Sequence, residues 1–367
     1  MRRRKSSGVV YGLVADKKVW HLAVLVLQQL HDVKSKLPAV VFNTTALPEE
    51  ALLSIAAFGA SQVSLEPRMP VPDEFAKPLS ASHGRLPAWT KLALWAQPFE
   101  KIIYLDLDVL ILNNVDHMAD FPRDSFTPEV CAWPQCIEDR IPAGINVGVM
   151  VIGPSLQIFS AFQDYALRRA GDLREAAAHD QLHGIQNGSR AASLGRQIVG
   201  SAEQSFIREF WDDVMNASIS EPHPIRKGWD WDVRSFVSEG TCSRRKQQHL
   251  RQHPHKPPQS CTPGTVNAIS RRYNARPADC VRCPIESLKP FIVHYACSPK
   301  PWERTRTKWL QGCKKDTNVM DYFCQPCVAN WTMRWFDAED RMCNTLVQVA
   351  PTALKRFPNA ACQSRKP

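Results

Sequence analysis

The stretch Lys101-Ile-Ile-Tyr-Leu-Asp-Leu-Asp-Val-Leu-Ile-Leu112 is a long apolar run that only two acidic residues, Asp106 and Asp108, interrupt. An ionised carboxylate is too costly to leave unpaired in a protein core. The run therefore predicts a buried parallel strand that ends near Asp106, with both acids at the carboxyl-terminal edge of a sheet. Two carboxylates placed there can share one divalent cation.

The segments before this run alternate between strand and helix patterns. Short apolar runs at residues 9–14 and 39–42 have the length of buried strands, and residues 62–65 are expected to form another strand. Residues 20–30, apolar nearly all round, and residues 48–58, which begin with proline and two acids, are predicted to be helices. This alternation predicts an α/β fold with a doubly wound, mostly parallel sheet, whose ligands bind at the carboxyl ends of the strands.

Further elements follow a proline-rich loop. Helices are expected at residues 89–97, 156–168 and 202–211, and strands at residues 145–152 and 290–295. The glycine in the middle of the first of these strands indicates that another group approaches the backbone closely there.

The chain divides into a main domain, residues 1–302, and a cysteine-rich carboxyl-terminal extension, residues 303–367. Residues 171–200 lack a clear period and are expected to form an insertion of loop and helix. Residues 234–263 are basic, polar and rich in proline, which is typical of a disordered excursion. Both insertions lie where elements facing an acceptor could sit.

The composition favours a globular protein with an anionic ligand. Of the 367 residues 44% are hydrophobic, and the formal charge of +10 is partly clustered at the amino terminus and at residues 244–256. Charge in two peripheral segments predicts no nucleic-acid partner, because that would need a continuous basic stripe. No run approaches the ~20 apolar residues of a membrane span. The amino terminus carries no recognisable signal peptide, so the cytoplasm is the expected compartment.

The cysteines support a different compartment. Ten of the twelve follow residue 240, and the pairs Cys280/Cys283 and Cys324/Cys327 have CxxC spacing. Their separation exceeds that of the usual zinc site, so zinc and disulfides both stay open. Four glycosylation sequons favour disulfides and, as the alternative compartment, the Golgi lumen. They lie at Asn43, Asn187, Asn216 and Asn330.

A second group of chemistry-bearing residues follows the last apolar strand. His294 stands near the end of that strand, and Lys300-Pro301 lies six residues beyond it. A lysine can pair with phosphate as a point charge, and the proline stiffens the turn that presents it. A histidine, two carboxylates and diphosphate oxygens together form a ligand set that suits manganese or magnesium.

The acidic pair alone also permits other interpretations. Phosphohydrolases of the haloacid dehalogenase type place D-x-D after an apolar strand, but here an apolar segment, residues 109–112, replaces the small hydroxyl residue that they need. The two acids could instead pair with lysines such as Lys91 for structural reasons alone. A non-catalytic scaffold, with the cysteine-rich extension as a binding module, is the third alternative.

Six segments occur in the order of the motifs of a known family. They are Thr90-Lys91-Leu92, Tyr104-Leu-Asp-Leu-Asp108, Asn146-Val-Gly148-Val-Met, Ala202-Glu-Gln204, Tyr273-Asn274 and the stretch from His294 to Trp302. They resemble the T-K-L, D-x-D, N-x-G, D/E-Q, Y-N and H-x-x-G-x-x-K-P-W motifs of the family 8 glycosyltransferases. The resemblance covers residues 9–302 and implies a GT-A-like fold with a Rossmann-like nucleotide-binding domain.

The resemblance implies a metal-dependent, retaining transferase that moves a hexose from a nucleotide sugar, usually a UDP-sugar, to a carbohydrate, polyol or protein hydroxyl. The implied manganese ligands are Asp106, Asp108 and His294. The implied donor contacts are Lys300 at the diphosphate, Leu107 and Gly148 within their motifs, and Lys91, Asn146 and Gln204 at the sugar. Glu203, beside Gln204, is the acid expected to act as nucleophile or electrostatic stabiliser, with Gln204 and Lys91 beside it in the catalytic group.

Two departures from the family pattern affect the donor site. Cys297 stands where the family has a glycine between His294 and Lys300, which changes how closely the backbone can approach a phosphate. The turn that binds uracil in the family has the sequence Asp16-Lys-Lys-Val-Trp20 here. Only its aromatic residue is kept, so Trp20 is the expected contact to the base.

Overall fold

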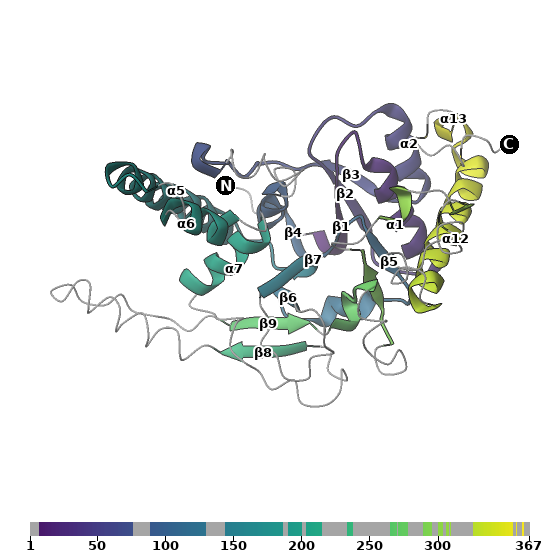
Figure 1. Ribbon diagram of the computed structural model, residues 1–367. Helices are drawn as coiled ribbons and strands as arrows, with labels where there is room; N and C mark the ends of the chain where they lie inside the picture. The colour runs from purple at the N-terminus through teal and green to yellow at the C-terminus, as the bar shows by residue number, and fades with distance from the viewer. Residues whose placement is uncertain are drawn as a thin grey trace.

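The computed structural model describes residues 7–75, 89–129, 144–185, 190–199, 203–214, 233–237, 265–269, 271–277, 289–295, 300–303, 306–307, 309, 326–354, 357 and 362. Within these ranges the main sheet has the strand order β3-β2-β1-β4-β7-β6-β9-β8 (Figure 1). Its strands in chain order are β1 (Ser7–Ala15), β2 (Ala39–Asn43), β3 (Ser61–Ser64), β4 (Phe99–Leu105), β6 (Ser125–Glu129), β7 (Gly144–Ile152), β8 (Val233–Val237) and β9 (Thr265–Ile269).

Helices cover this sheet, and short 3₁₀ turns connect several of the strands. The α-helices are α1 (Trp20–Asp32), α2 (Glu49–Ala57), α5 (Leu156–Leu182), α6 (Arg190–Val199), α7 (Glu203–Asp213), α12 (Pro326–Val349) and α13 (Pro351–Leu354). The 3₁₀ helices are η1 (Thr90–Ala96), η2 (Asp116–Asp120), η3 (Arg271–Tyr273) and η4 (Pro301–Glu303).

The first four strands confirm the predicted alternation. β3, β2, β1 and β4 pair in parallel, and α1 and α2 connect the first three of them. Beyond β4 the sheet is mixed, because β7 runs antiparallel to both β4 and β6. The parallel half therefore brings the carboxyl ends of β1, β2 and β4 to one edge, where the candidate site lies.

The acidic run forms two strands where the sequence predicted one. β4 ends at Leu105, and Val109 begins β5 (Val109–Ile111), which pairs antiparallel with β10 (Ile292–His294) in a separate sheet. Two backbone hydrogen bonds fix the turn between them: the amide of Asp106 donates to Gly148 (2.7 Å), and the amide of Tyr295 donates to Asp108 (2.9 Å). The turn holds both acids between the two sheets.

The two predicted insertions differ from expectation. Most of residues 171–200 is helical, because α5 continues to Leu182 and α6 follows it. The sequence pattern is weak there because small and polar residues such as Ala176 and Asp180 are buried beside the large apolar Leu173. The first part of 234–263 belongs to strand β8, which contradicts disorder at residues 234–237, and the remainder lies outside the described residues.

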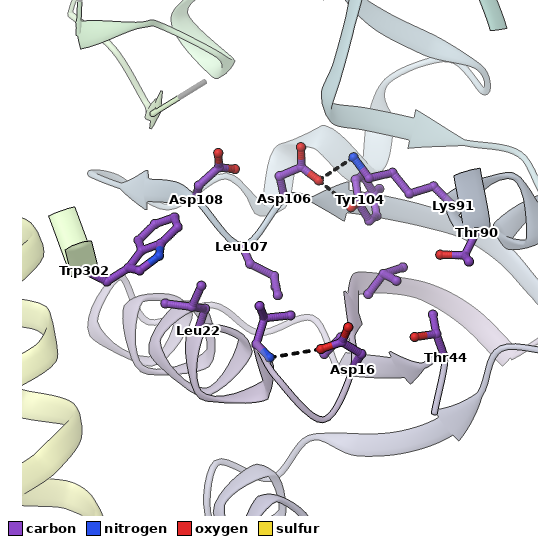
Figure 2. A pocket seen from close by; sticks show the side chains of 13 residues that line it. Asp16, Leu22, Thr44, Thr90, Lys91, Tyr104, Asp106, Leu107, Asp108 and Trp302 are labelled. Carbon is purple, nitrogen blue, oxygen red and sulfur yellow. Dashed lines mark hydrogen bonds and ion pairs between the residues drawn. The ribbon is translucent and has the colours of Figure 1, made fainter. Parts of the chain in front are cut away.

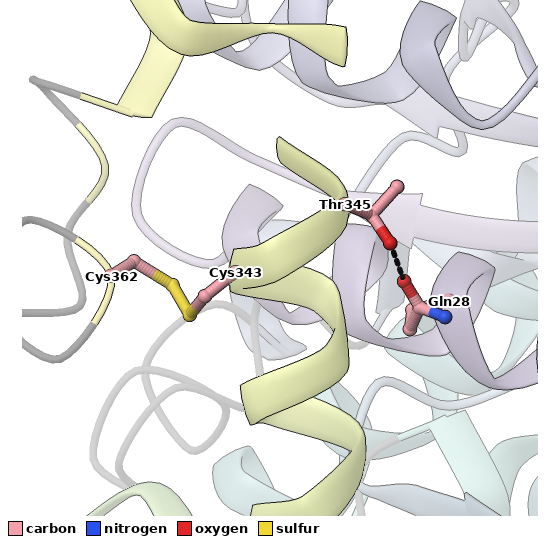
Figure 3. Close-up of a disulfide and its surroundings, with 4 residues drawn as sticks. All are labelled: Gln28, Cys343, Thr345 and Cys362. Atoms are coloured by element: carbon pink, nitrogen blue, oxygen red, sulfur yellow. Dashed lines mark hydrogen bonds between the residues drawn. A yellow bond between two sulfur atoms is a disulfide. The ribbon is translucent and has the colours of Figure 1, made fainter. Parts of the chain in front are cut away.

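Part of the carboxyl-terminal extension packs on the main domain. Helix α12 lies beside α1 (Figure 1), where the Thr345 hydroxyl donates to the Gln28 side chain at 2.9 Å. A disulfide joins Cys343 of α12 to Cys362 (Figure 3), and Cys327 is also disulfide-bonded. These cysteines support the disulfide alternative over zinc. The boundary at residue 302 stays a prediction.

Two further sequence features meet the structure here. The sequon at Asn43 lies on a side chain that is 8% exposed, and its amide nitrogen donates to the Thr45 carbonyl at 3.0 Å. A glycan cannot be attached to this buried amide in the folded chain.

Across the described residues, every helix is too short or too polar to cross a lipid bilayer.

Asp124 is a partly buried acid that joins three elements. It has a left-handed backbone conformation with φ of +55° between η2 and β6. Its carboxylate accepts hydrogen bonds from Trp95 Nε1 (2.9 Å) and from the Gly153 amide (3.2 Å). Burial raises the pKa of Asp124 to about 6, although these hydrogen bonds and the charge of Arg123 act in the opposite direction.

We expect the burial of Asp124 to make the protein less stable as the pH rises from about 4 to 7. The pKa is higher in the folded state than in the unfolded state, so the folded chain binds more protons in this window and stability falls with rising pH. Asn tolerates the left-handed conformation and does not titrate. The unfolding free energy of Asp124→Asn minus wild type should therefore rise by about 2 kcal/mol across this window in urea denaturation. A pH-independent difference would contradict this expectation.

Candidate active site

Three side chains with ligand atoms for a metal converge where the two sheets meet. Asp106 and Asp108 stand in the turn after β4, and His294 ends β10. His294 Nε2 lies 3.0 Å from Asp108 Oδ1 and 3.6 Å from Asp106 Oδ2. One ligand atom from each residue lies within 4.8 Å of the other two. The structure thus brings together residues that are more than 180 positions apart in the sequence.

A chain of hydrogen bonds orients the His294 ring. The Gly148 amide donates to Asn146 Oδ1 (2.9 Å), and this oxygen also accepts from Asn274 Nδ2 (2.7 Å). The Asn274 amide therefore presents its oxygen to His294 Nδ1 at 2.8 Å. Nδ1 therefore contacts this oxygen, and Nε2 faces the two aspartates, which is the orientation of a metal-ligating histidine.

The His294 imidazole packs directly against the backbone of Gly148. A Cβ atom built on Gly148 would overlap the His294 imidazole. The close approach that the glycine predicted is therefore made by the imidazole of His294. The contacts of Gly148 and Asn146 with a donor stay predictions.

Lys91 lies in a nearly buried ion-pair network. Its ammonium group is 2.7 Å from Asp106 Oδ1 and 2.9 Å from Glu203 Oε1. The Tyr104 hydroxyl donates to the same Asp106 oxygen at 2.5 Å. Burial would lower the pKa of Lys91, but attraction to Asp106 and Glu203 raises it well above its usual value, so the lysine stays charged.

Lys300 is placed against the second aspartate. Its ammonium donates to Asp108 Oδ2 and to the Tyr295 carbonyl, the latter at 2.7 Å. Burial alone would raise the pKa of Asp108, but His294 and Lys300 outweigh it and lower this pKa below its usual value. Asp108 therefore carries a full negative charge.

The lysine pairs leave room for a cation. Each carboxylate turns one oxygen to a lysine, Asp106 to Lys91 and Asp108 to Lys300, and the other oxygen towards His294. Two carboxylate oxygens and one imidazole nitrogen fit manganese or magnesium. A purely structural pairing of acids with lysines would not need the histidine.

Asp106, Asp108 and Lys91 lie in one wall of a cleft of about 360 Å³, which is the size of a small-molecule site. Figure 2 shows Asp106 and Asp108 on one side, Asp16 and Thr44 on the other, and Leu107 pointing between them. The residues that line the cleft come from the ends of β1 and β4, the first turn of α1, and η1 and η4. The site lies at the strand edge that the sequence predicted.

Trp20 is placed differently from its predicted role. Its side chain is 2% exposed and packs edge-on against Phe357, with ring centroids 5.0 Å apart. The indole does not line the cleft. A base contact through Trp20 is therefore not supported. Val19 and Leu22, on either side of it in sequence, line the cleft.

The remaining predicted residues lie beside the cluster or outside the described residues. Gln204 is half-buried in the first turn of α7, directly after Glu203, and its contact with a donor stays a prediction. Cys297 lies outside the described residues. Sequence reasoning gave no role to Asn274 and Tyr104. The Y-N motif and the position of Tyr104 two residues before Asp106 were the available signals.

Comparison with known proteins gives partial matches, and no family model matches the chain. Galactinol synthase 5 of Arabidopsis thaliana is 29% identical over 171 residues, which is 39% of this chain and 50% of that protein. Glycogenin of Neurospora crassa is 35% identical over 83 residues, 22% of this chain and 11% of that protein. The chain thus spans about half the length of the galactinol synthases that it matches.

A solved structure of the galactosyltransferase LgtC, in complex with donor and acceptor sugar analogs, also aligns with the chain. The alignment covers 90% of this chain and 96% of the other, with a TM-score of 0.43 and 13% sequence identity. A structure of mouse xyloside xylosyltransferase 1 aligns over 79% of this chain and 98% of the other, with a TM-score of 0.32 and 10% sequence identity.

Proposed function

We propose that this chain, a homologue of the family 8 glycosyltransferases galactinol synthase and glycogenin, is itself a metal-dependent, retaining glycosyltransferase. It would move a hexose from a UDP-sugar to a hydroxyl of a carbohydrate, polyol or protein acceptor. The observation that carries the proposal is the convergence of Asp106, Asp108 and His294 on one point beside a cleft. Because the homology covers part of the chain, the activity itself is the proposal.

In this proposal Asp106, Asp108 and His294 would hold manganese or magnesium. Such a cation would offset the negative charge that the diphosphate gains as it leaves. Lys300 adds a second positive charge beside Asp108. The bond from the anomeric carbon to the diphosphate oxygen breaks, and the acceptor hydroxyl forms the new bond and gives its proton to the departing diphosphate oxygen.

Lys91, Asn146 and Gln204 are proposed to face the donor sugar, with Leu107 and Gly148 beside them. Glu203 is held by Lys91 at 2.9 Å and is 5% exposed. A carboxylate whose charge is shared with a lysine is a weaker nucleophile, which favours electrostatic stabilisation of the anomeric carbon as its role. Retention through front-face attack needs no covalent bond to Glu203.

Removing the Lys300 side chain should weaken donor binding. Lys300→Ala loses one charge-assisted contact to the diphosphate, about 2–3 kcal/mol, which corresponds to a UDP dissociation constant about 30- to 150-fold higher. Calorimetric titration with UDP in the presence of manganese measures this change. Lys36→Ala removes an equal charge at an exposed position that does not line the cleft, and it should bind UDP as the wild type does. Unchanged affinity in Lys300→Ala would refute the assignment.

An assay of UDP release tests the function directly. The purified chain is incubated with a panel of UDP-sugars and candidate acceptors, with manganese and with a chelator. Release that requires both manganese and an acceptor supports the transferase. Phosphate release from simple esters without an acceptor would instead identify a phosphohydrolase, and failure to bind manganese and UDP would identify a non-catalytic chain.

The compartment has its own test. We propose the cytoplasm as the compartment, whereas the Cys343–Cys362 disulfide is typical of an oxidising one, because cytosolic thiols are kept reduced. Alkylation of free thiols in protein isolated without reductant, followed by mass spectrometry, distinguishes the two. Alkylated Cys343 and Cys362 would support the cytoplasm, and an intact bridge would oppose it.

A further inference from the structure

Helix α12 contacts both ends of the segment that carries Lys300. Trp335 is fully buried and meets Tyr295 edge-on, with ring centroids 5.5 Å apart, and Trp302 at 5.4 Å. Tyr295 precedes Lys300 by five residues and Trp302 follows it by two. One helix of the extension thus supports the segment on both sides.

The two residues that Trp335 touches are also the neighbours of the Lys300 ammonium group. The Tyr295 carbonyl accepts a hydrogen bond from Lys300 Nζ at 2.7 Å, and the Tyr295 amide donates to the Asp108 carbonyl at 2.9 Å. Lys300 Nζ also lies 5.7 Å from the centre of the Trp302 ring, within cation–π range. Trp302 itself lines the cleft, at the end nearest α12 (Figure 2).

We propose that Trp335 is a positioning residue for donor binding, an inference that rests on the proposed function. It does not line the cleft, but it fixes the two residues that direct Lys300 towards Asp108. A lysine has four rotatable bonds, so its ammonium reaches one place only where its neighbours hold it. A displacement of about 1 Å in such a group can lower a binding affinity or a reaction rate by up to about 100-fold.

A positioning role for Trp335 can be distinguished from a role in core packing alone. A core tryptophan that only stabilises the fold would, when shortened, lower the melting temperature and leave ligand affinity unchanged in the folded protein. A tryptophan that positions Lys300 changes affinity in fully folded protein. The two roles therefore separate when binding is measured well below the melting temperature.

The test compares Trp335→Leu with Trp331→Leu. Trp331 lies one turn earlier on α12, is 6% exposed, and makes no ring contact with Tyr295 or Trp302 among the described residues. Calorimetric titration with UDP and manganese, at a temperature where circular dichroism shows each variant folded, should give about tenfold weaker binding for Trp335→Leu. Trp331→Leu should bind as the wild type does. Trp335→Phe, which keeps one aromatic ring, should lie between the two.

A double variant links the effect to Lys300. If Trp335 acts through Lys300, then Trp335→Leu should not weaken UDP binding further in a Lys300→Ala background. Additive losses, or equal losses in Trp335→Leu and Trp331→Leu, would overturn the inference. If Trp335→Leu does not fold, Trp335→Phe against Trp331→Phe makes the same comparison.

The outcomes also separate this inference from the proposed function. Wild-type protein that binds UDP, together with a folded Trp335→Leu variant of equal affinity, would overturn only the role of Trp335. Wild-type protein that binds no UDP would overturn both.

Discussion

Replacing Asp108 with asparagine is expected to lower the rate of sugar transfer by at least about 10³-fold, or about 4 kcal/mol, without unfolding the chain. The substitution keeps the shape of the side chain but removes the charge from the oxygen that lies 3.0 Å from His294 Nε2. A neutral amide is a poor ligand for manganese, so metal binding should be lost with the activity. The fold should persist because the backbone carbonyl of residue 108 still accepts from the Tyr295 amide.

The measurement is UDP release with manganese, beside a manganese titration and a thermal melt of each protein. Asp32→Asn is a matched control: Asp32 ends α1 and pairs with Arg341 at 2.8 Å, and it does not line the cleft. This control should keep wild-type transfer. An Asp108→Asn variant with turnover close to that of the wild type would show that the aspartate is not a metal ligand.

Replacing Lys91 with methionine should destabilise the protein by about 3–5 kcal/mol and abolish transfer. Methionine fills a similar volume, but Asp106 and Glu203 then lose the ammonium that lies within 3 Å of both. A buried carboxylate without its partner must become protonated or reach water. Loss of the pair should also release the Asp106 carboxylate from its place in the metal cluster.

Urea denaturation of a double-variant series tests this explanation. Lys91→Met/Glu203→Gln removes one of the two unpaired charges, so it should be more stable than Lys91→Met alone, although both should be inactive. If the double variant is the less stable protein, then the destabilisation comes from the lost packing of the lysine chain and not from unpaired charge.

The sequence predicted the parallel half of the fold because its signals there are local. The apolar runs of β1 and β2 and the helices that follow them each have a pattern that can be recognised within about a dozen residues. The pairing of β5 with β10 has no such signal, since residues 109–112 are equally apolar whether they extend β4 or begin another strand. Only the turn at Asp106 to Asp108, fixed by distant backbone partners, decides between them.

The sequence predicted the residues of the candidate metal cluster, but not the residues that pack around the site. The approach of His294 to the aspartates agrees with the order of motifs, and Gly148 indicated a close contact. The burial of Trp20 could not be predicted, because its partner Phe357 lies more than 300 residues away in an extension without a recognisable motif. The contact of Trp335 with Trp302 has no sequence signal either, because Trp335 lies in the same extension. Short motifs predict which residues form the site, whereas the residues that support them are determined by packing between distant parts of the chain.

The fit of the His294 ring against Gly148 also limits how this site can diverge. Any residue with a side chain at position 148 would occupy the volume of the imidazole, so the glycine cannot change while the histidine is present. The reverse order is open, because a smaller residue at position 294 would free that space first. Laboratory evolution of the metal preference of this chain would therefore have to vary position 294 before, or together with, position 148.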